Sequence, residues 1–86
     1  MAGEINPVRD LGSINGKHNS LNDAEINSVY SYNKNATAVS NVPIDNNGVV
    51  VTFGTLSPLT KIQIFSSYYE AKIRVYINQW WDWRDL

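Results

Sequence analysis

The chain has no cysteine and a single histidine, His18, among its 86 residues. Disulfides are therefore excluded, and so is a structural zinc site, which takes its ligands mainly from cysteine and histidine. A single core in a chain this short supplies only about 3 to 5 kcal/mol of net stability, and small domains usually add a crosslink, a metal or a partner. We therefore expect self-association to stabilise this protein.

An excess of charge of one sign and long apolar runs are also missing. Seven Lys and Arg residues stand against eight Asp and Glu residues, for a net charge of −1, and the basic residues are scattered. This pattern does not favour a nucleic-acid partner, because binding to phosphates needs clustered positive charge. No segment approaches the about 20 apolar residues of a membrane span, and the first ten residues do not resemble a signal peptide. We expect synthesis in the cytoplasm and no membrane insertion.

Residues suited to catalysis or metal binding occur without the spacing that either function needs. His18 lies in a stretch typical of a loop, and the carboxylates of Glu70, Asp82 and Asp85 are the best candidates for a catalytic pair, although so small a chain offers no evident deep pocket. Residues 45–48 (DNNG) carry oxygen ligands for calcium but lack the spacing and the closing Glu of a calcium loop, which favours a plain turn. We expect no enzyme activity, no metal and no cofactor.

The first 27 residues are rich in Gly, Asn and Asp and poor in large apolar side chains. Asn15-Gly16 favours a turn, and residues 20–23 (SLND) fit either a capping box with a turn or two of helix or an Asx-turn. We therefore expect residues 1–27 to be a mostly irregular linker or attachment segment.

From residue 28 onward the apolar residues recur with a period of two, which is typical of β-strands. In residues 72–77 (KIRVYI), Ile73, Val75 and Ile77 face one way and the polar residues the other, as in a half-buried strand. Residues 49–53 (VVVTF) are apolar on both sides, so this strand has both faces covered by its own chain or one face covered by a neighbouring subunit. Further strands are expected at residues 29–32, 61–64 and 83–86.

These strands predict a mainly β fold: a small antiparallel meander or sandwich-like knob over residues 28–86. The polar loop 33–47 contains Pro43, and we expect it to cross the edge or end of the sheet. Open edges in so small a protein invite pairing with another chain, which again indicates an oligomer.

Aromatic residues are numerous and grouped. All three tryptophans, Trp80, Trp81 and Trp83, lie within four residues of one another, and Tyr68 and Tyr69 occupy a predicted turn. Burial is the better prediction for an average aromatic residue, but adjacent side chains at a turn cannot easily both point inward. Tyr68 and Tyr69 are therefore expected to be exposed.

The order of these motifs resembles the knob-type domain of bacteriophage and R-type pyocin tail fibres. The resemblance covers residues 28–86 and depends on six segments: residues 29–32 (VYSY), 41–48 (NVPIDNNG), 49–54 (VVVTFG), 61–65 (KIQIF), 72–76 (KIRVY) and 80–84 (WWDWR). Two features depart from that family. Residues 25–28 replace the usual Pro-Gly before the first strand, and Trp81 replaces a small polar residue.

The resemblance implies a homotrimeric component of a virion tail fibre that takes part in attachment to the bacterial host and contacts other tail or fibre proteins. It also implies that Trp80 and Trp83 close the core. Trp81 is then the additional aromatic residue, to be covered by a neighbouring subunit or by a surface ligand such as a bacterial glycan, and we expect Trp81, Tyr68 and Tyr69 to contact the receptor. Two alternatives stay open: a monomeric carbohydrate-binding module that uses these three residues as a stacking platform, and an inert spacer of a fibre.

Overall fold

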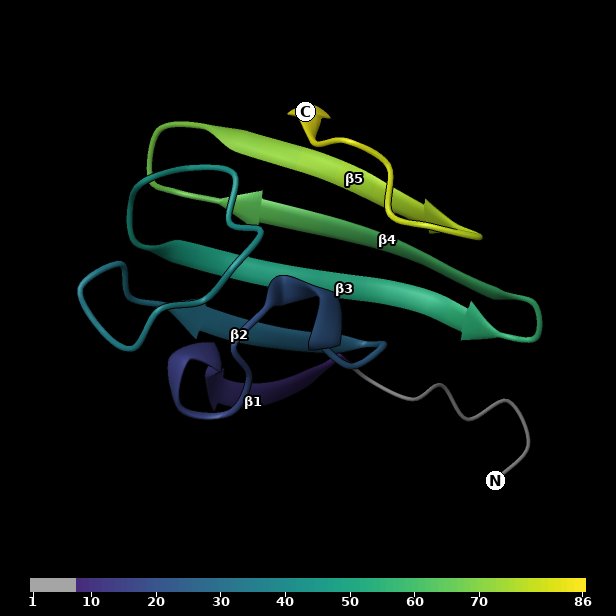
Figure 1. The fold of residues 1–86 in the computed structure, drawn as a ribbon, viewed down its shortest axis with the longest axis horizontal. Helices are drawn as coiled ribbons and strands as arrows, with labels where there is room; N and C mark the ends of the chain where they lie inside the picture. The colour runs from purple at the N-terminus through teal and green to yellow at the C-terminus, as the bar shows by residue number, and fades with distance from the viewer. Residues whose placement is uncertain (1–7) are drawn as a thin grey trace.

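The structure, a computed structural model, describes residues 8–86, and its six strands form one sheet in the order β1 to β6 (Figure 1). From β2 to β6 each strand is antiparallel to its neighbour, whereas β1 is parallel to β2. The strands are β1 (Arg9–Ser13), β2 (Ser28–Tyr32), β3 (Gly48–Leu56), β4 (Leu59–Ser66), β5 (Ala71–Ile77) and β6 (Arg84–Asp85). The predicted mainly β fold and the meander from the second strand onward are confirmed.

The N-terminal part of the chain belongs to the same folded unit as the meander. The sequence predicts a linker or attachment segment up to residue 27, but β1 adds a strand to the sheet, and the side chains of Ile14, Leu21 and Ala24 are buried in the core. Two single 3₁₀ turns, η1 (Ile14–Gly16) and η2 (Leu21–Asp23), contain Ile14 and Leu21, and Ala24 directly follows η2 as its C-cap. No boundary therefore separates residues 8–27 from the rest, and the first seven residues of the predicted segment lie outside the described part.

A helical turn forms at residues 20–23, as one of the two interpretations of that stretch predicts. Ser20 is the N-cap of η2, and its hydroxyl accepts a hydrogen bond from the backbone N–H of Asn22 at 3.1 Å. The turn is 3₁₀ and only three residues long. Its role is to bring Leu21 down onto the sheet, where that side chain is fully buried.

One face of the sheet, the inner face, is covered by the chain's own loops. Figure 1 shows η2 and the loop 33–47 in front of the sheet. The sequence predicts that this loop crosses the edge or end of the sheet, but Val39 and Ile44 within it are buried in the core. The loop therefore takes the place that a second sheet has in a sandwich. The core consists of Ile14, Leu21, Ala24, Tyr30, Val39, Ile44, Val50 and Phe65.

The other face of the sheet, the outer face, carries the apolar half of the period-two pattern. The alternation predicted for residues 72–77 is confirmed, but the predicted burial is wrong: Arg74 is 4% exposed, whereas Ile77 is 53% exposed. The reason is that the loops cover the face to which Arg74 points. The sheet thus buries a mixed polar and apolar face and leaves an aliphatic face uncovered within the described chain.

Candidate functional site

The outer face of the central strands has an unusual composition. Within β2–β5, all of which the structure describes, the side chains on this face are apolar or small and uncharged. Val49, Phe53, Ile62 and Ile77 are between 39% and 53% exposed. Pairing of the strands places on the outer face Val29, Ser31, Val49, Val51, Phe53, Thr55, Thr60, Ile62, Ile64, Ser66, Ala71, Ile73, Val75 and Ile77.

The register of the sheet joins the large side chains into one continuous surface. Val51 is paired with Val29 on one side and with Ile64 on the other, and Ile64 is paired with Ile73. The next row runs from Phe53 through Ile62 to Val75. Contiguous exposed apolar surface of this kind usually marks a site of interaction with another molecule.

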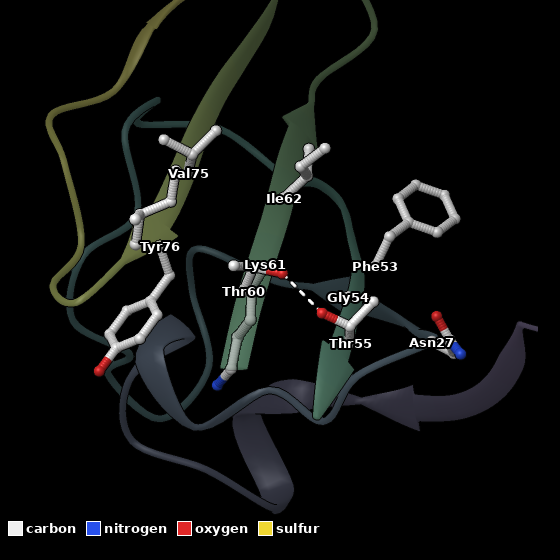
Figure 2. Close-up of a pocket in the computed structure, with 10 residues that line it drawn as sticks. Asn27, Phe53, Gly54, Thr55, Thr60, Lys61, Ile62, Val75 and Tyr76 are labelled. Carbon is white, nitrogen blue, oxygen red and sulfur yellow. Dashed lines mark hydrogen bonds between the residues drawn. The ribbon is translucent and has the colours of Figure 1, made fainter. Parts of the chain in front are cut away.

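A shallow hollow lies at one end of the outer face (Figure 2). It encloses about 460 Å³, and its walls include Phe53, Ile62, Val75 and Ile77. Figure 2 shows Ile62 and Val75 on one side of the sheet, while the side chains of Lys61 and Tyr76 point to the other side. The hydroxyls of Thr55 and Thr60 are hydrogen-bonded to each other, with their oxygens 2.7 Å apart. The hollow suits an apolar side chain of another polypeptide rather than acid–base chemistry.

Trp81 stands at the edge of the outer face. Tyr76 and Trp80 form an antiparallel bridge, and the backbone N–H of Trp81 donates to the carbonyl of Val75 at 2.9 Å. This pairing sets Trp81 opposite Val75, on the outer side, and its side chain is the most exposed of the three tryptophans, with the residue 54% exposed. Its indole Nε1 donates to the carbonyl oxygen of Ile77 at 3.3 Å, which fixes the ring against the end of β5.

Trp80 and Trp83 lie on the inner side and enclose Arg74. The guanidinium carbon of Arg74 is 3.8 Å from the ring centroid of Trp80 and 4.6 Å from that of Trp83. Trp83 packs against the core, and its Nε1 donates to the carbonyl oxygen of Asn41 at 3.0 Å. Planar stacking of this kind is characteristic of arginine and is stronger when water is excluded.

The N–H donors of the buried Arg74 guanidinium form hydrogen bonds with neutral side chains. Its Nε donates to Gln63 Oε1 at 2.8 Å and its Nη2 to Asn22 Oδ1 at 2.9 Å. Gln63 in turn donates to the carbonyl of Leu21 at 2.8 Å and to Thr52 Oγ1 at 3.0 Å. Among residues 8–86 no carboxylate pairs with Arg74, and burial lowers the pKa of Arg74 to about 10. This network links η2 to three strands.

Sequence reasoning missed this network because it assigned Arg74 to a polar, solvent-facing side. Two signals could have found it. Gln63 is the only long polar residue among its apolar neighbours 62–65, and it is directly paired with Arg74. The two spaced tryptophans that follow β5 supply flat partners for a guanidinium.

Tyr68 and Tyr69 lie in the turn between β4 and β5 and are 89% and 60% exposed. Their rings meet edge to face with centroids 4.7 Å apart. The hydroxyl of Ser67 fixes the turn, because it accepts from the backbone N–H of Tyr69 at 3.4 Å and of Glu70 at 3.3 Å. A hollow of about 630 Å³ lies beside Tyr68, with Asn46 and Asn47 among its walls.

The structure does not bring the three predicted contact residues together. Tyr68 and Tyr69 precede β5, whereas Trp81 follows its far end, and seven residues of strand extend over about 20 Å. A single stacking platform made from these three residues is therefore absent from the chain as the structure describes it. The tyrosine turn and the outer face with Trp81 are two separate sites.

His18 belongs to a small cluster with Glu25, which lies in the connection from η2 to β2, and Tyr30 of β2. His18 Nε2 is 2.9 Å from Glu25 Oε1. The same carboxylate oxygen accepts a hydrogen bond from the hydroxyl of Tyr30. Burial opposes ionisation of Glu25, but the hydrogen bonds from Tyr30 and His18 outweigh it and lower its pKa. Burial and the bond to Glu25 raise the pKa of Tyr30. The hydroxyl of Ser28 donates to the backbone carbonyl of Glu25 at 2.6 Å, and within the described chain no hydroxyl is hydrogen-bonded to the ring of His18. We therefore interpret the cluster as one that holds the connection before β2 in place.

The remaining acidic candidates are also dispersed. Asp85 pairs with Lys72 across β5 and β6, and Glu70 lies in the tyrosine turn at the end of β4. In residues 45–48 the side chain of Asn47 accepts from the backbone N–H of Lys34 at 2.9 Å, so it supports a turn. Residues 8–86 contain no cluster of three or more acidic or histidine side chains that could hold a metal. No helix in this part of the chain is long and apolar enough to cross a membrane.

Comparisons with models of known families, with characterised proteins and with solved structures find no match to this chain. The resemblance to tail-fibre knobs therefore depends on the sequence motifs alone.

Proposed function

We propose that the chain is a non-enzymatic component of a bacteriophage or phage-like tail fibre, that it forms a homotrimer, and that it takes part in attachment to the bacterial surface. The observation that carries this proposal is the uncovered outer face. An aliphatic sheet face left in water forgoes about 25 cal/mol for every Å² that a partner could bury. A domain with such a face is stable and soluble as part of an assembly.

The width of the outer face supports a three-fold arrangement. Facing sheets pack about 10 Å apart, so each lies about 5 Å from the middle of the layer. Three sheets placed about 5 Å from a common axis form a triangular prism with sides of about 17 Å. The strands β2–β5, spaced about 4.8 Å apart, present about 19 Å of apolar width, which matches one side of that prism.

The direction of the strands supports a fibre with two distinct ends. β1 begins at Arg9, which is paired with Ser28 at the start of β2, while β2 ends at Tyr32 opposite Gly48. The tyrosine turn follows β4 at that second end, and Figure 1 shows the β3–β4 turn and the β4–β5 turn at opposite ends of the sheet. With strands along the fibre axis, Tyr68 and Tyr69 of all three copies are displayed together at the end away from the β3–β4 turn.

The tyrosine turn has the chemistry of a glycan contact. Two exposed phenol rings offer flat apolar faces. The side-chain oxygens of Asn46 and Asn47 next to Tyr68 accept backbone hydrogen bonds, which leaves their amide N–H groups for sugar hydroxyls. We infer that this turn, rather than Trp81, touches the host surface, because Trp81 lies where neighbouring copies meet. The fibre would act in the virion tail, with other tail or fibre proteins as its further partners.

The monomeric carbohydrate-binding module is a second candidate, favoured by the hollow beside Tyr68. It shares the tyrosine turn but predicts a stable monomer. The inert spacer predicts a trimer that binds no cell.

Binding of labelled protein to a panel of bacterial cells tests the proposal. The variant Tyr68→Ser/Tyr69→Ser is compared with Leu56→Ser/Leu59→Ser, which removes exposed apolar residues from the β3–β4 hairpin at the other end of the sheet. We expect wild type and the leucine variant to bind and the tyrosine variant to lose at least ten-fold in cell affinity. Equal binding by both folded variants would exclude the tyrosine turn as the receptor contact, and binding to no cell would favour the spacer.

A further inference from the structure

Two opposite charges stand at the two edges of the outer face. Asp10 in β1 is paired with Val29, so its side chain emerges on the outer side next to β2. Arg84 in β6 is paired with Ile73, so its side chain emerges on the same side next to β5. Both residues are exposed. The uncharged face therefore has an acidic residue at one border and a basic residue at the other.

Asp10 and Arg84 cannot meet within one chain, because all of β2–β5 lies between them. The ion pairs formed within residues 8–86 join His18 to Glu25 and Lys72 to Asp85, and neither involves these two edge residues. One carboxylate oxygen of Asp10 accepts from the backbone N–H of Gly12 at 3.0 Å. This bond orients the side chain and leaves its second oxygen available to a neighbour.

The signs of the charges select how two copies can approach. If the symmetry axis runs across the strands, the β1 edges of two copies face each other and Asp10 meets Asp10. If the axis runs along the strands, the β1 edge of one copy meets the β6 edge of the next, and Asp10 meets Arg84. Like charges in contact are unfavourable and opposite charges fix the register, so the second arrangement is the one the edges favour.

We propose that copies of this chain associate through their outer faces around an axis parallel to the strands, with Asp10 of each copy paired with Arg84 of the next. This inference rests on the proposed homotrimer and adds its geometry: Phe53, Ile62 and Val75 line the interior, and the Asp10–Arg84 pairs close the three seams. Trp81, next to β5 on the outer side, then covers the apolar surface at each seam.

Charge exchange in the full chain tests the seam. Asp10→Arg and Arg84→Asp each place like charges together at every seam, so we expect the monomer–trimer equilibrium to shift at least about ten-fold toward monomer in low salt. The double variant Asp10→Arg/Arg84→Asp restores opposite charges, and we expect it to regain the wild-type equilibrium within about three-fold. The measurement is sedimentation equilibrium at about 0.05 M and 0.5 M salt, because screening should shrink the difference.

Two matched control variants make the same kind of charge change at positions that do not lie on the outer face. Asp45→Arg and Lys34→Asp lie in the exposed part of the loop over the inner face, and both should keep the wild-type equilibrium. An equal mixture of the two single edge variants should recover only partly, since a ring of three retains one like-charged seam. Full recovery by mixing would overturn the three-fold arrangement.

The outcomes separate this inference from the proposed function. Single edge variants that associate as well as wild type would overturn the Asp10–Arg84 seam while leaving the trimer standing. A double variant as weak as the single variants would also overturn it. A wild type that is monomeric under all conditions would overturn the trimer itself.

Discussion

Truncation of Arg74 should destabilise the domain more than any change at an exposed cation. Arg74→Ala removes two ring contacts, each worth about 1 to 2 kcal/mol when water is excluded. It also leaves the fully buried Oε1 of Gln63 without its donor, at a cost of about 1 to 3 kcal/mol. Relief of the desolvation that lowers the pKa of Arg74 offsets part of this, so we expect a net loss of about 3 kcal/mol.

That loss is large for a chain of 86 residues, whose free energy of unfolding should lie at the lower end of the usual range, about 4 kcal/mol. Urea unfolding at one fixed protein concentration, followed by tryptophan fluorescence, measures it and also reports on the stacked rings of Trp80 and Trp83. Arg74→Lys keeps the charge but not the planar fork, so it should lose about 2 kcal/mol. The control Lys34→Ala, at an exposed site, should change stability by less than about 0.5 kcal/mol. A loss below about 1 kcal/mol for Arg74→Ala would refute the reasoning.

Three further perturbations test other parts of the fold. Because the pKa of Glu25 is lowered in the folded state, this residue contributes stability that is present above its ordinary pKa of 4.5 and is lost as the pH falls through the lower folded value. Between pH 7 and pH 3 the free energy of unfolding should therefore fall less steeply for Glu25→Gln than for wild type. An equal slope for the two proteins would contradict this. Gly48→Ala sets a Cβ 2.5 Å from the carbonyl oxygen of Ser66 and should cost about 1 to 3 kcal/mol by thermal unfolding, whereas Gly16→Ala, with nothing within 4 Å, should be close to neutral. Trp81→Ala should keep the circular dichroism of wild type but weaken self-association at least ten-fold, and loss of the fold instead would place Trp81 in the structural core.

The strands from β2 onward could be predicted from the sequence, but the face that the chain covers could not. Period-two alternation places Ile73, Val75 and Ile77 on one side whatever lies above them. Which side is covered depends on where loop 33–47 folds, and that follows from long-range contacts of Val39 and Ile44 with the core. A polar residue such as Arg74 can occupy the buried side because its partners come from elsewhere in the chain.

The first strand could not be predicted because its sequence carries no strand pattern. Residues 9–13 (RDLGS) contain one large apolar residue, and β1 forms by parallel pairing with β2 across an irregular register. Its stability comes from the core contacts of Ile14 and Leu21, which follow it in the chain. The candidate sites were predictable in part. The exposure of Tyr68 and Tyr69 follows from their place in a turn, whereas that of Trp81 was expected only from the family resemblance. The separation of the three residues depends on the strand between them.

Sedimentation equilibrium of wild type beside Ile62→Asp and Leu56→Asp tests the central claim, that copies of the chain cover the outer face. Ile62 is 44% exposed on this face, between Phe53 and Val75 of the neighbouring strands, while Leu56 is 81% exposed at the tip of the β3–β4 hairpin. A charge at Ile62 would be buried in the assembly without a partner. We predict a trimer for wild type and Leu56→Asp and a folded monomer for Ile62→Asp. A wild-type monomer at the highest concentrations, or a trimer that tolerates Ile62→Asp, would contradict the account.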